Sequence, residues 1–153
     1  MSKTYLKSDH FSGGGSLPLH AKRIANGSVS AAWAGPGHWL MADEGGTPDD
    51  FEERPQYSLA GLASVTGQSD GRSIMRVSGP MVRRMLAKMI PIDLHPREFL
   101  PGDAALTVAS HINVHFWLTE DGAAFEFAVF RSLAAAFIER LAEASEEFGF
   151  VFE

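Results

Sequence analysis

The chain contains no cysteine, which excludes disulfide bonds, thiolate catalysis and cysteine-based metal sites. No apolar run approaches the roughly 18 residues that a membrane-spanning helix needs, and residues 1–11 lack the apolar segment of a secretory signal. Basic residues never exceed two in a row and the formal net charge is −6, so no nucleic-acid-binding surface is expected. A cytoplasmic protein that contacts neither membrane nor nucleic acid is the expectation.

Apolar residues, by contrast, are plentiful. They make up 45% of the 153 residues and include eleven phenylalanines, which is enough to fill a core. The length fits a single domain or two closely packed halves. We expect a flexible N-terminal arm over residues 1–27, because this stretch is rich in Ser, Gly and Lys. A single domain over 28–153 follows, with a first half at 28–63 and a second at 64–153.

The glycine run Gly13–Gly15 could suggest phosphate binding. A phosphate-binding loop needs a preceding strand and a following helix, usually with Lys-Ser/Thr. Here Leu17-Pro18-Leu19 follows instead. We therefore interpret the glycine run as part of the arm.

Periodicity and turn residues predict alternating strands and helices. A helix is expected to begin at Thr47, because Pro48 and the acids Asp49 and Asp50 suit its first turn. The pattern predicts further helices from Gly79-Pro80 to Pro91 and over 132–148, and strands at 28–34, 39–41, 64–68, 73–77, 106–118 (with a bend or turn near Ser110) and 124–129. This order favours an α+β fold with antiparallel or mixed sheets and helices on one face.

The strand pattern at 106–118 separates two faces. One is apolar and predicted to be buried, with Leu106, Val108, Ile112, Val114, Phe116 and Leu118. The other carries Thr107, His111, Asn113, His115 and Trp117. It is too mixed for a core, holds a large aromatic residue and contains no Lys or Glu, which favours a partner interface. We assign that interface to His111, Asn113, His115 and Trp117.

Several residue pairs could carry chemistry but have a simpler interpretation. His111 and His115 have the spacing of helical zinc ligands, yet on a strand they would lie about 13 Å apart. Asp93 and His95 could form an acid–base pair, although an Asp capping a Leu-His-Pro turn is the more ordinary role. No nucleophile or glycine-rich anion cradle accompanies them. We therefore assign no catalytic, cofactor-binding or metal residue to this chain.

Two further sets also have a structural interpretation. Arg83, Arg84 and Lys88 are expected to form a solvated basic helix face, with partner contact as the second possibility. Trp39 and Trp117 could stack on a pterin ring, but packing in the core or an interface is favoured for both.

Three motifs, in order, carry a resemblance to a known family. They are the strand–Gly-Pro–Trp-Leu turn over 32–40, the pattern of two strands and Ser-Gly-Pro over 65–80, and Asp93-Leu94-His95-Pro96 followed by Phe99 and Pro101-Gly102. Together they resemble the gamma subunit of heterotetrameric sarcosine oxidase, which is related to the folate-binding fold of glycine-cleavage aminomethyltransferases. The resemblance implies an aminomethyltransferase-like fold of two ferredoxin-like halves, with a first half shortened before Ser28.

The resemblance also implies a function. It is that of a non-catalytic structural subunit in a flavoenzyme complex that oxidatively demethylates sarcosine, with folate as the one-carbon acceptor on other subunits. The alpha, beta and delta subunits would be its partners and would hold FAD, FMN, NAD, tetrahydrofolate and zinc. The chain alone is expected to self-associate and to lack activity. The alternative is a free-standing folate-binding or aminomethyltransferase-like protein, although no acidic residue matches that family's pterin contact.

Overall fold

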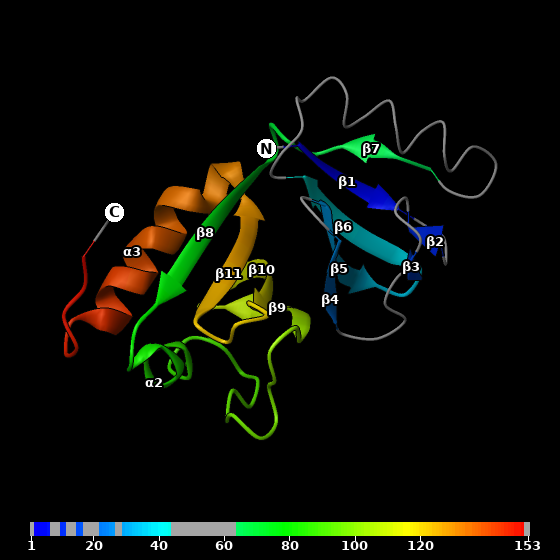
Figure 1. The fold of residues 1–153 in the computed structure, drawn as a ribbon. Helices are drawn as coiled ribbons and strands as arrows, with labels where there is room; N and C mark the ends of the chain where they lie inside the picture. The colour runs from blue at the N-terminus through cyan, green and yellow to red at the C-terminus, as the bar shows by residue number, and fades with distance from the viewer. Residues whose placement is uncertain are drawn as a thin grey trace. The chain divides into compact units, whose positions relative to one another are not determined.

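The computed structural model describes residues 2–6, 10–11, 15–16, 22–26, 29–43 and 64–151 (Figure 1). They form a mixed α+β structure on antiparallel sheets, as predicted. The chain divides into two compact units, Met1–Asp70 with Asp103–Ala105, and Gly71–Gly102 with Leu106–Glu153. The helix predicted to begin at Thr47 lies outside the described residues.

The first unit is built on a five-stranded sheet. Its strand order is β4 (Arg23–Asn26), β5 (Val29–Gly35), β6 (His38–Asp43), β1 (Ser2–Leu6) and β7 (Thr66–Gly67). The short strands β2 (His10–Phe11) and β3 (Gly15–Ser16) pair separately. The β5–β6 hairpin is the predicted one, and its turn uses Gly37 at φ 68°, a conformation that glycine adopts without strain. Trp39 and Met41 of β6 are buried.

The flexible arm predicted over residues 1–27 is wrong where the structure describes it. Strand β1 lies between β6 and β7, and Thr4 faces Met41 in the antiparallel register. Strand β4 pairs with β5. Backbone hydrogen bonds to a neighbouring strand do not require an apolar sequence, so a polar composition did not reveal these strands. The division between the compact units falls at Asp70 and Gly71.

The second unit has a four-stranded sheet with helices beside it. The strand order is β8 (Arg72–Ser78), β11 (Ala124–Phe130), β10 (Ile112–Leu118) and β9 (Ala104–Ala109). Its helical segments are α2 (Val82–Leu86), the 3₁₀ turn η1 (Arg131–Leu133) and α3 (Ala134–Ser145). Figure 1 shows α3 running alongside β8 and β11. The predicted strands at 64–68 and 73–77 belong to different sheets, because β7 pairs with β1 and β8 pairs with β11.

A row of phenylalanine rings forms the core of the second unit. Phe137 of α3 lies 5.2 Å from Phe127 of β11, which lies 5.5 Å from Phe116 of β10, measured between ring centroids. Phe99, from the loop before β9, stacks on Phe116 at 5.1 Å. Phe137, Phe127 and Phe116 are each 0% exposed. The aromatic row therefore joins the helix, two strands and the loop into one core.

The strand predicted over 106–118 is a hairpin of two strands. Ser110 and His111 have φ values of 44° and 71°, as a two-residue type I′ turn requires. Such a turn places Ala109 opposite Ile112, so Thr107 lies on the face of Ile112 while Leu106 and Val108 lie on the other. Ile112, Val114, Phe116 and Leu118 are buried as predicted, but Leu106 and Val108 are 47% and 41% exposed. The prediction that Leu106 and Val108 are buried was wrong. The two-residue turn was not anticipated, and it places these two residues on the opposite face of the sheet from Ile112.

Apolar residues at helical spacing in the helix predicted over 132–148 predict a buried stripe of Leu133, Phe137, Leu141, Ala144 and Phe148. Phe137 and Leu141 are buried, whereas Ala144 and Phe148 are partly exposed. Leu133 is 38% exposed, because it belongs to η1, before α3 begins. Ser145 is buried instead, and its hydroxyl donates to the Leu141 carbonyl at 2.6 Å.

Candidate interaction face of the second sheet

The side of the second sheet that bears Trp117 carries a polar ladder across three strands. Trp117 of β10, Glu126 of β11 and Arg76 of β8 occupy one register row. The Trp117 indole N–H donates to Glu126 Oε2 at 2.6 Å, and Arg76 Nη1 lies 3.6 Å from Glu126 Oε1. One carboxylate therefore serves an indole and a guanidinium, which ties the three strands together on this face. We call this side of the sheet the polar face.

A second pair on the polar face joins Arg72 of β8 to His115 of β10. Arg72 Nη1 lies 3.2 Å from His115 Nδ1, and both residues are 7% exposed. A guanidinium only donates, so Nδ1 is the acceptor and the imidazole carries its proton on Nε2. The Arg72 guanidinium also lies 4.2 Å from the centroid of the Phe130 ring. Arg131 donates to the Arg72 carbonyl at 3.3 Å.

The four residues predicted as a partner interface are divided by the structure. His111 sits in the hairpin turn and is exposed, as is Asn113. His115 and Trp117 are buried and hydrogen-bonded to Arg72 and Glu126. The four therefore do not form one exposed surface. The partner interface stays a prediction, and it now rests on His111 and Asn113.

The predicted solvated basic face of α2 is wrong for Arg83. Arg83 Nη1 donates to the carbonyls of Leu94 and Phe99, the latter at 3.2 Å, and its guanidinium lies 5.3 Å from the Phe125 ring centroid. Desolvation by burial lowers the pKa of Arg83, but an arginine stays charged at neutral pH. This side chain fixes the loop that follows α2.

The other two basic residues meet the end of α3. Arg84 is exposed and lies 5.9 Å from the Phe148 ring centroid. Lys88 Nζ lies 4.8 Å from the same centroid, donates to the Ala144 carbonyl at 3.0 Å and pairs with Glu147. Helix C-termini leave carbonyls without intrahelical partners, and Lys88 supplies one donor there.

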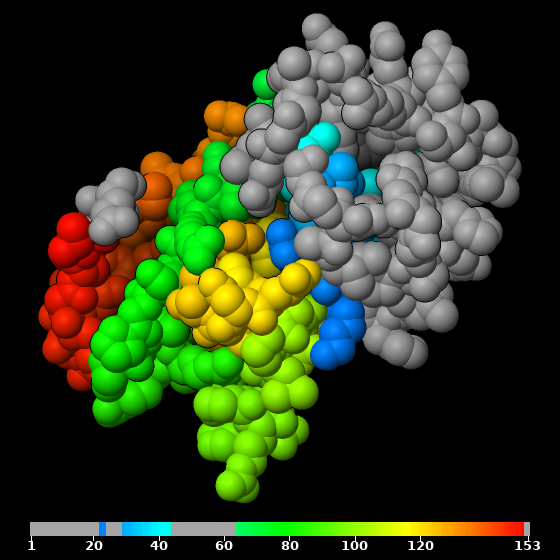
Figure 2. All heavy atoms as spheres, viewed as in Figure 1, coloured from blue at the N-terminus to red at the C-terminus, as the bar shows by residue number. Residues whose placement is uncertain are grey.

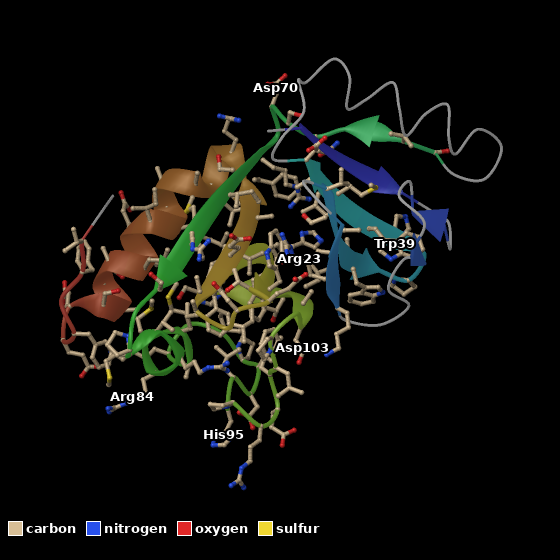
Figure 3. The ribbon with its side chains drawn as sticks, in the orientation of Figure 1. Arg23, Trp39, Asp70, Arg84, His95 and Asp103 are labelled. Carbon is tan, nitrogen blue, oxygen red and sulfur yellow. The ribbon has the colours of Figure 1, made fainter. Side chains whose placement is uncertain are left out.

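Asp93 and His95 play the structural role predicted for them. Asp93 Oδ1 accepts the His95 backbone N–H at 2.8 Å, and His95 Nδ1 accepts the Arg97 backbone N–H at 3.2 Å. Both side chains are exposed. The loop that carries them projects from its unit, in yellow-green in Figure 2, with His95 labelled on it in Figure 3. Leu94 and Phe99 anchor this loop in the core.

Trp39 and Trp117 are 3% and 4% exposed. Both side chains are therefore packed, as predicted, and neither offers an open surface on which a ring could stack. Among the described residues, no group of three His, Cys, Asp or Glu side chains could hold a metal ion. No helix of the described ranges is long and apolar enough to cross a membrane. Sequence reasoning missed Arg72, Arg76 and Glu126. The available signal was that Arg76 and Glu126 lie on predicted strands and that Arg72, just before the first of these strands, is four residues from Arg76 and so on the same face.

These observations define an α+β protein built on antiparallel sheets, in which polar side chains hold strands, turns and helix ends together. The chain belongs to the sarcosine oxidase, gamma subunit family, whose model matches residues 3–147.

Curated relatives and a solved structure agree with this family. The chain is 34% identical over 114 residues to the sarcosine oxidase subunit gamma of Corynebacterium sp. (strain U-96), covering 67% of this chain and 51% of that protein. It is 33% identical to the subunit gamma of an Arthrobacter species, covering 69% of this chain and 53% of that protein. The chain thus spans about half the length of the curated relatives it matches.

The structural match is to the heterotetrameric sarcosine oxidase from Corynebacterium sp. U-96, in complex with pyrrole 2-carboxylate. Its TM-score is 0.84 at 24% identity, covering 99% of this chain and 83% of that chain. At this identity the likeness shows the fold alone.

Proposed function

We propose that the chain is a non-catalytic structural subunit of a sarcosine oxidase-type flavoenzyme complex. The family match over residues 3–147 carries this proposal. The sequence offers no nucleophile with a base beside it. Side chains of the polar face instead bind one another: Trp117 binds Glu126, and Arg72 binds His115. The chemistry is therefore assigned to other subunits.

The proposed partners are the alpha, beta and delta subunits of such a complex. They would hold FAD, FMN, NAD, tetrahydrofolate and zinc, and would demethylate sarcosine oxidatively with folate as the one-carbon acceptor. A cytoplasmic location is part of the same proposal. The relatives that support it are themselves gamma subunits, and one solved relative is part of a heterotetramer.

The finer fold assignment belongs to this proposal as well. We infer that the two compact units correspond to the two halves of an aminomethyltransferase-like fold. The second unit supports this, because its elements follow the order β8, α2, β9, β10, β11 and α3 around an antiparallel sheet. The resemblance implied that the first half is shortened before Ser28. In that part of the chain the first sheet contains strands β1 and β4.

The experiment is to purify the chain alone and examine its absorbance and activity. We expect a colourless protein that does not oxidise sarcosine and does not bind tetrahydrofolate in a titration. A flavin absorption band, or turnover of sarcosine by this chain alone, would refute the non-catalytic role. Stoichiometric tetrahydrofolate binding would favour the free-standing folate-binding alternative.

A further inference from the structure

We propose that residues 149–153, which we call the post-helix segment, form a fifth strand of the second sheet by pairing antiparallel with the outer edge of β8. The outer edge is the side of β8 that faces away from β11. In this structure residues 149–151 belong to no strand, so the pairing requires the segment to move onto the edge. The inference concerns this chain alone and does not rest on the proposed function.

The two larger sheets repeat one strand topology. In the first sheet β1 pairs with β6, and β4, β5 and β6 follow one another as neighbouring strands. In the second sheet β8 pairs with β11, and β9, β10 and β11 follow one another in the same way. Strand β1 of the first sheet thus corresponds to β8 of the second, and β6 corresponds to β11.

The first sheet has one strand more than the second. Strand β7 pairs antiparallel with β1, on the side of β1 that faces away from β6. The corresponding side of β8 has no neighbouring strand among those that the structure describes. In the first unit 22 residues, 44–65, lie between β6 and β7, and in the second 19 residues, 131–149, lie between β11 and Phe150. The post-helix segment therefore has the place in the second repeat that β7 has in the first.

The end of α3 lies beside the helix that follows β8. Lys88, just after α2, donates to the Ala144 carbonyl at 3.0 Å, and its Nζ lies 4.8 Å from the Phe148 ring centroid. Residues 79–81 alone separate β8 from α2, and Figure 1 shows β8 pointing toward α2. A segment that starts at Phe148 and runs back along β8 is therefore antiparallel to β8, as β7 is to β1.

The post-helix segment has the sequence of a short strand. Gly149 has a φ of 73°, a left-handed conformation that commonly ends helical turns and that glycine adopts without strain. Phe150, Val151 and Phe152 follow it, and aromatic and β-branched residues are favoured in strands. The family model matches residues 3–147, so the segment lies beyond the matched region.

Tethering favours the chain's own segment over a second copy as the strand on this edge. The contacts of Lys88 hold the start of the segment beside α2, within the same unit. A short tether of this kind gives an effective concentration on the order of millimolar, which a second copy would have to reach in order to compete. An open edge strand invites pairing between molecules, and the docked segment would prevent it.

The strand registers identify the positions that the segment should cover. Strands β1 and β8 each begin opposite the last residue of the strand with which they pair, β6 and β11. Counted from that residue, the two positions of β1 that β7 covers, Thr4 and Tyr5, correspond to Ile74 and Met75 of β8. We therefore expect the segment to lie opposite the middle of β8.

Disulfide trapping in the full chain tests the pairing, and it is clean because the chain has no native cysteine. Val151→Cys is combined in turn with Ile74→Cys, Met75→Cys and Arg76→Cys, and each variant is oxidised. A disulfide forms only where the two Cα atoms come within about 7 Å. Val151→Cys with Leu106→Cys is the control, since Leu106 lies on β9, the strand at the other end of the sheet. Thermal melts establish folding, and mass spectrometry of mixed labelled and unlabelled chains separates crosslinks within a chain from those between chains.

We expect crosslinks within the chain that alternate along β8, because successive side chains of a strand point to opposite faces. The crosslink should form at Met75 and not at its two neighbours, or at one or both neighbours and not at Met75. Equal crosslinking at all three positions, as a mobile segment would give, overturns the proposal, and so does no crosslinking. Crosslinks between chains alone would assign the edge to a second copy and also overturn it.

Hydrogen exchange provides a second measurement that needs no cysteine. Deleting residues 149–153 should make alternate backbone amides of β8 exchange about tenfold faster, since these amides would lose their partners on the segment. The strand β9 at the other end of the sheet should exchange as in wild type. Where a cysteine variant does not fold, this measurement decides, and unchanged exchange of β8 overturns the proposal.

Discussion

Single residues of the second unit act mainly by joining elements that are distant in sequence. Arg83 donates to the Leu94 and Phe99 carbonyls, and Glu126 accepts from Trp117 beside Arg76. Each contact uses a charged group, and such hydrogen bonds stabilise by more than neutral ones do. Charged residues, which composition alone would place on the surface, thus connect the strands and the loop of this unit.

Phe137 is the residue whose loss should be most costly. Its ring is 0% exposed and lies 5.2 Å from the Phe127 ring. Phe137→Ala should lower the free energy of unfolding by about 3–5 kcal/mol, because it removes a large buried group and leaves a cavity. Urea denaturation measures this loss. A change below about 1 kcal/mol would mean that the aromatic row is not the core of this unit.

Asp121 should make a pH-dependent contribution to stability. Its pKa lies below the usual range because the Thr119 hydroxyl donates to its carboxylate at 2.5 Å and the Ala123 N–H donates at 3.0 Å. A carboxyl whose folded pKa is below its unfolded pKa stabilises the fold above the unfolded pKa, and this is lost as pH falls through the folded pKa.

We therefore expect Asp121→Asn to have a lower urea midpoint than wild type at neutral pH. The difference should shrink as pH falls below the ordinary pKa of an aspartate and through the lowered pKa of Asp121, because the wild-type carboxyl then becomes protonated. A difference that stays constant over this range would show that the carboxylate charge is not involved.

At the scale of elements, Lys88 should stabilise the end of α3. Lys88→Met keeps the apolar stem but loses the donor to the Ala144 carbonyl, and it should cost about 0.5–1.5 kcal/mol. Arg140→Met is the matched control, because Arg140 has the same side-chain exposure, 43%, and its one ion pair within the described residues is with Glu143. An exposed ion pair of that kind is worth little. Equal effects of the two variants in denaturation would count against the helix-end role of Lys88.

The elements with strong local signals were predictable from the sequence. The β5–β6 hairpin, β11 and the buried positions Phe137 and Leu141 follow from glycine turns and apolar periodicity. The hairpin at Ser110 shows the limit. A two-residue turn without glycine or asparagine is hard to detect, and missing it assigned Leu106 and Val108 to the wrong face.

The strand pairing and the candidate face depend on long-range contacts that the periodicity of apolar residues does not reveal. Strand β1 pairs with β6 about forty residues away, and β8 pairs with β11 rather than with the neighbouring β7. Such pairings are fixed by the complete sheet and not by a local pattern. The candidate face was only partly predicted, because the contacts of Trp117 with Glu126 and of His115 with Arg72 join strands that are distant in sequence.

At the scale of the whole molecule, the chain is expected to be a poor monomer. Exposed apolar residues such as Leu106, Phe130 and Val151 suit a subunit better than an isolated protein. Light scattering should show that the lone chain self-associates or is poorly soluble, and co-expression with the large flavoenzyme subunits should restore a defined particle. A clean, soluble monomer of the lone chain would argue against this expectation.

The most direct test of the structural-subunit account is co-purification. A tagged copy of this chain is expressed with the alpha, beta and delta subunits from the same genome, and the particle is analysed by gel filtration with light scattering. The account predicts that all the subunits elute together in a fixed ratio, with flavin absorbance and sarcosine oxidation found only in that particle. The contradicting result is a tagged chain that elutes without the other subunits while they assemble and oxidise sarcosine in its absence.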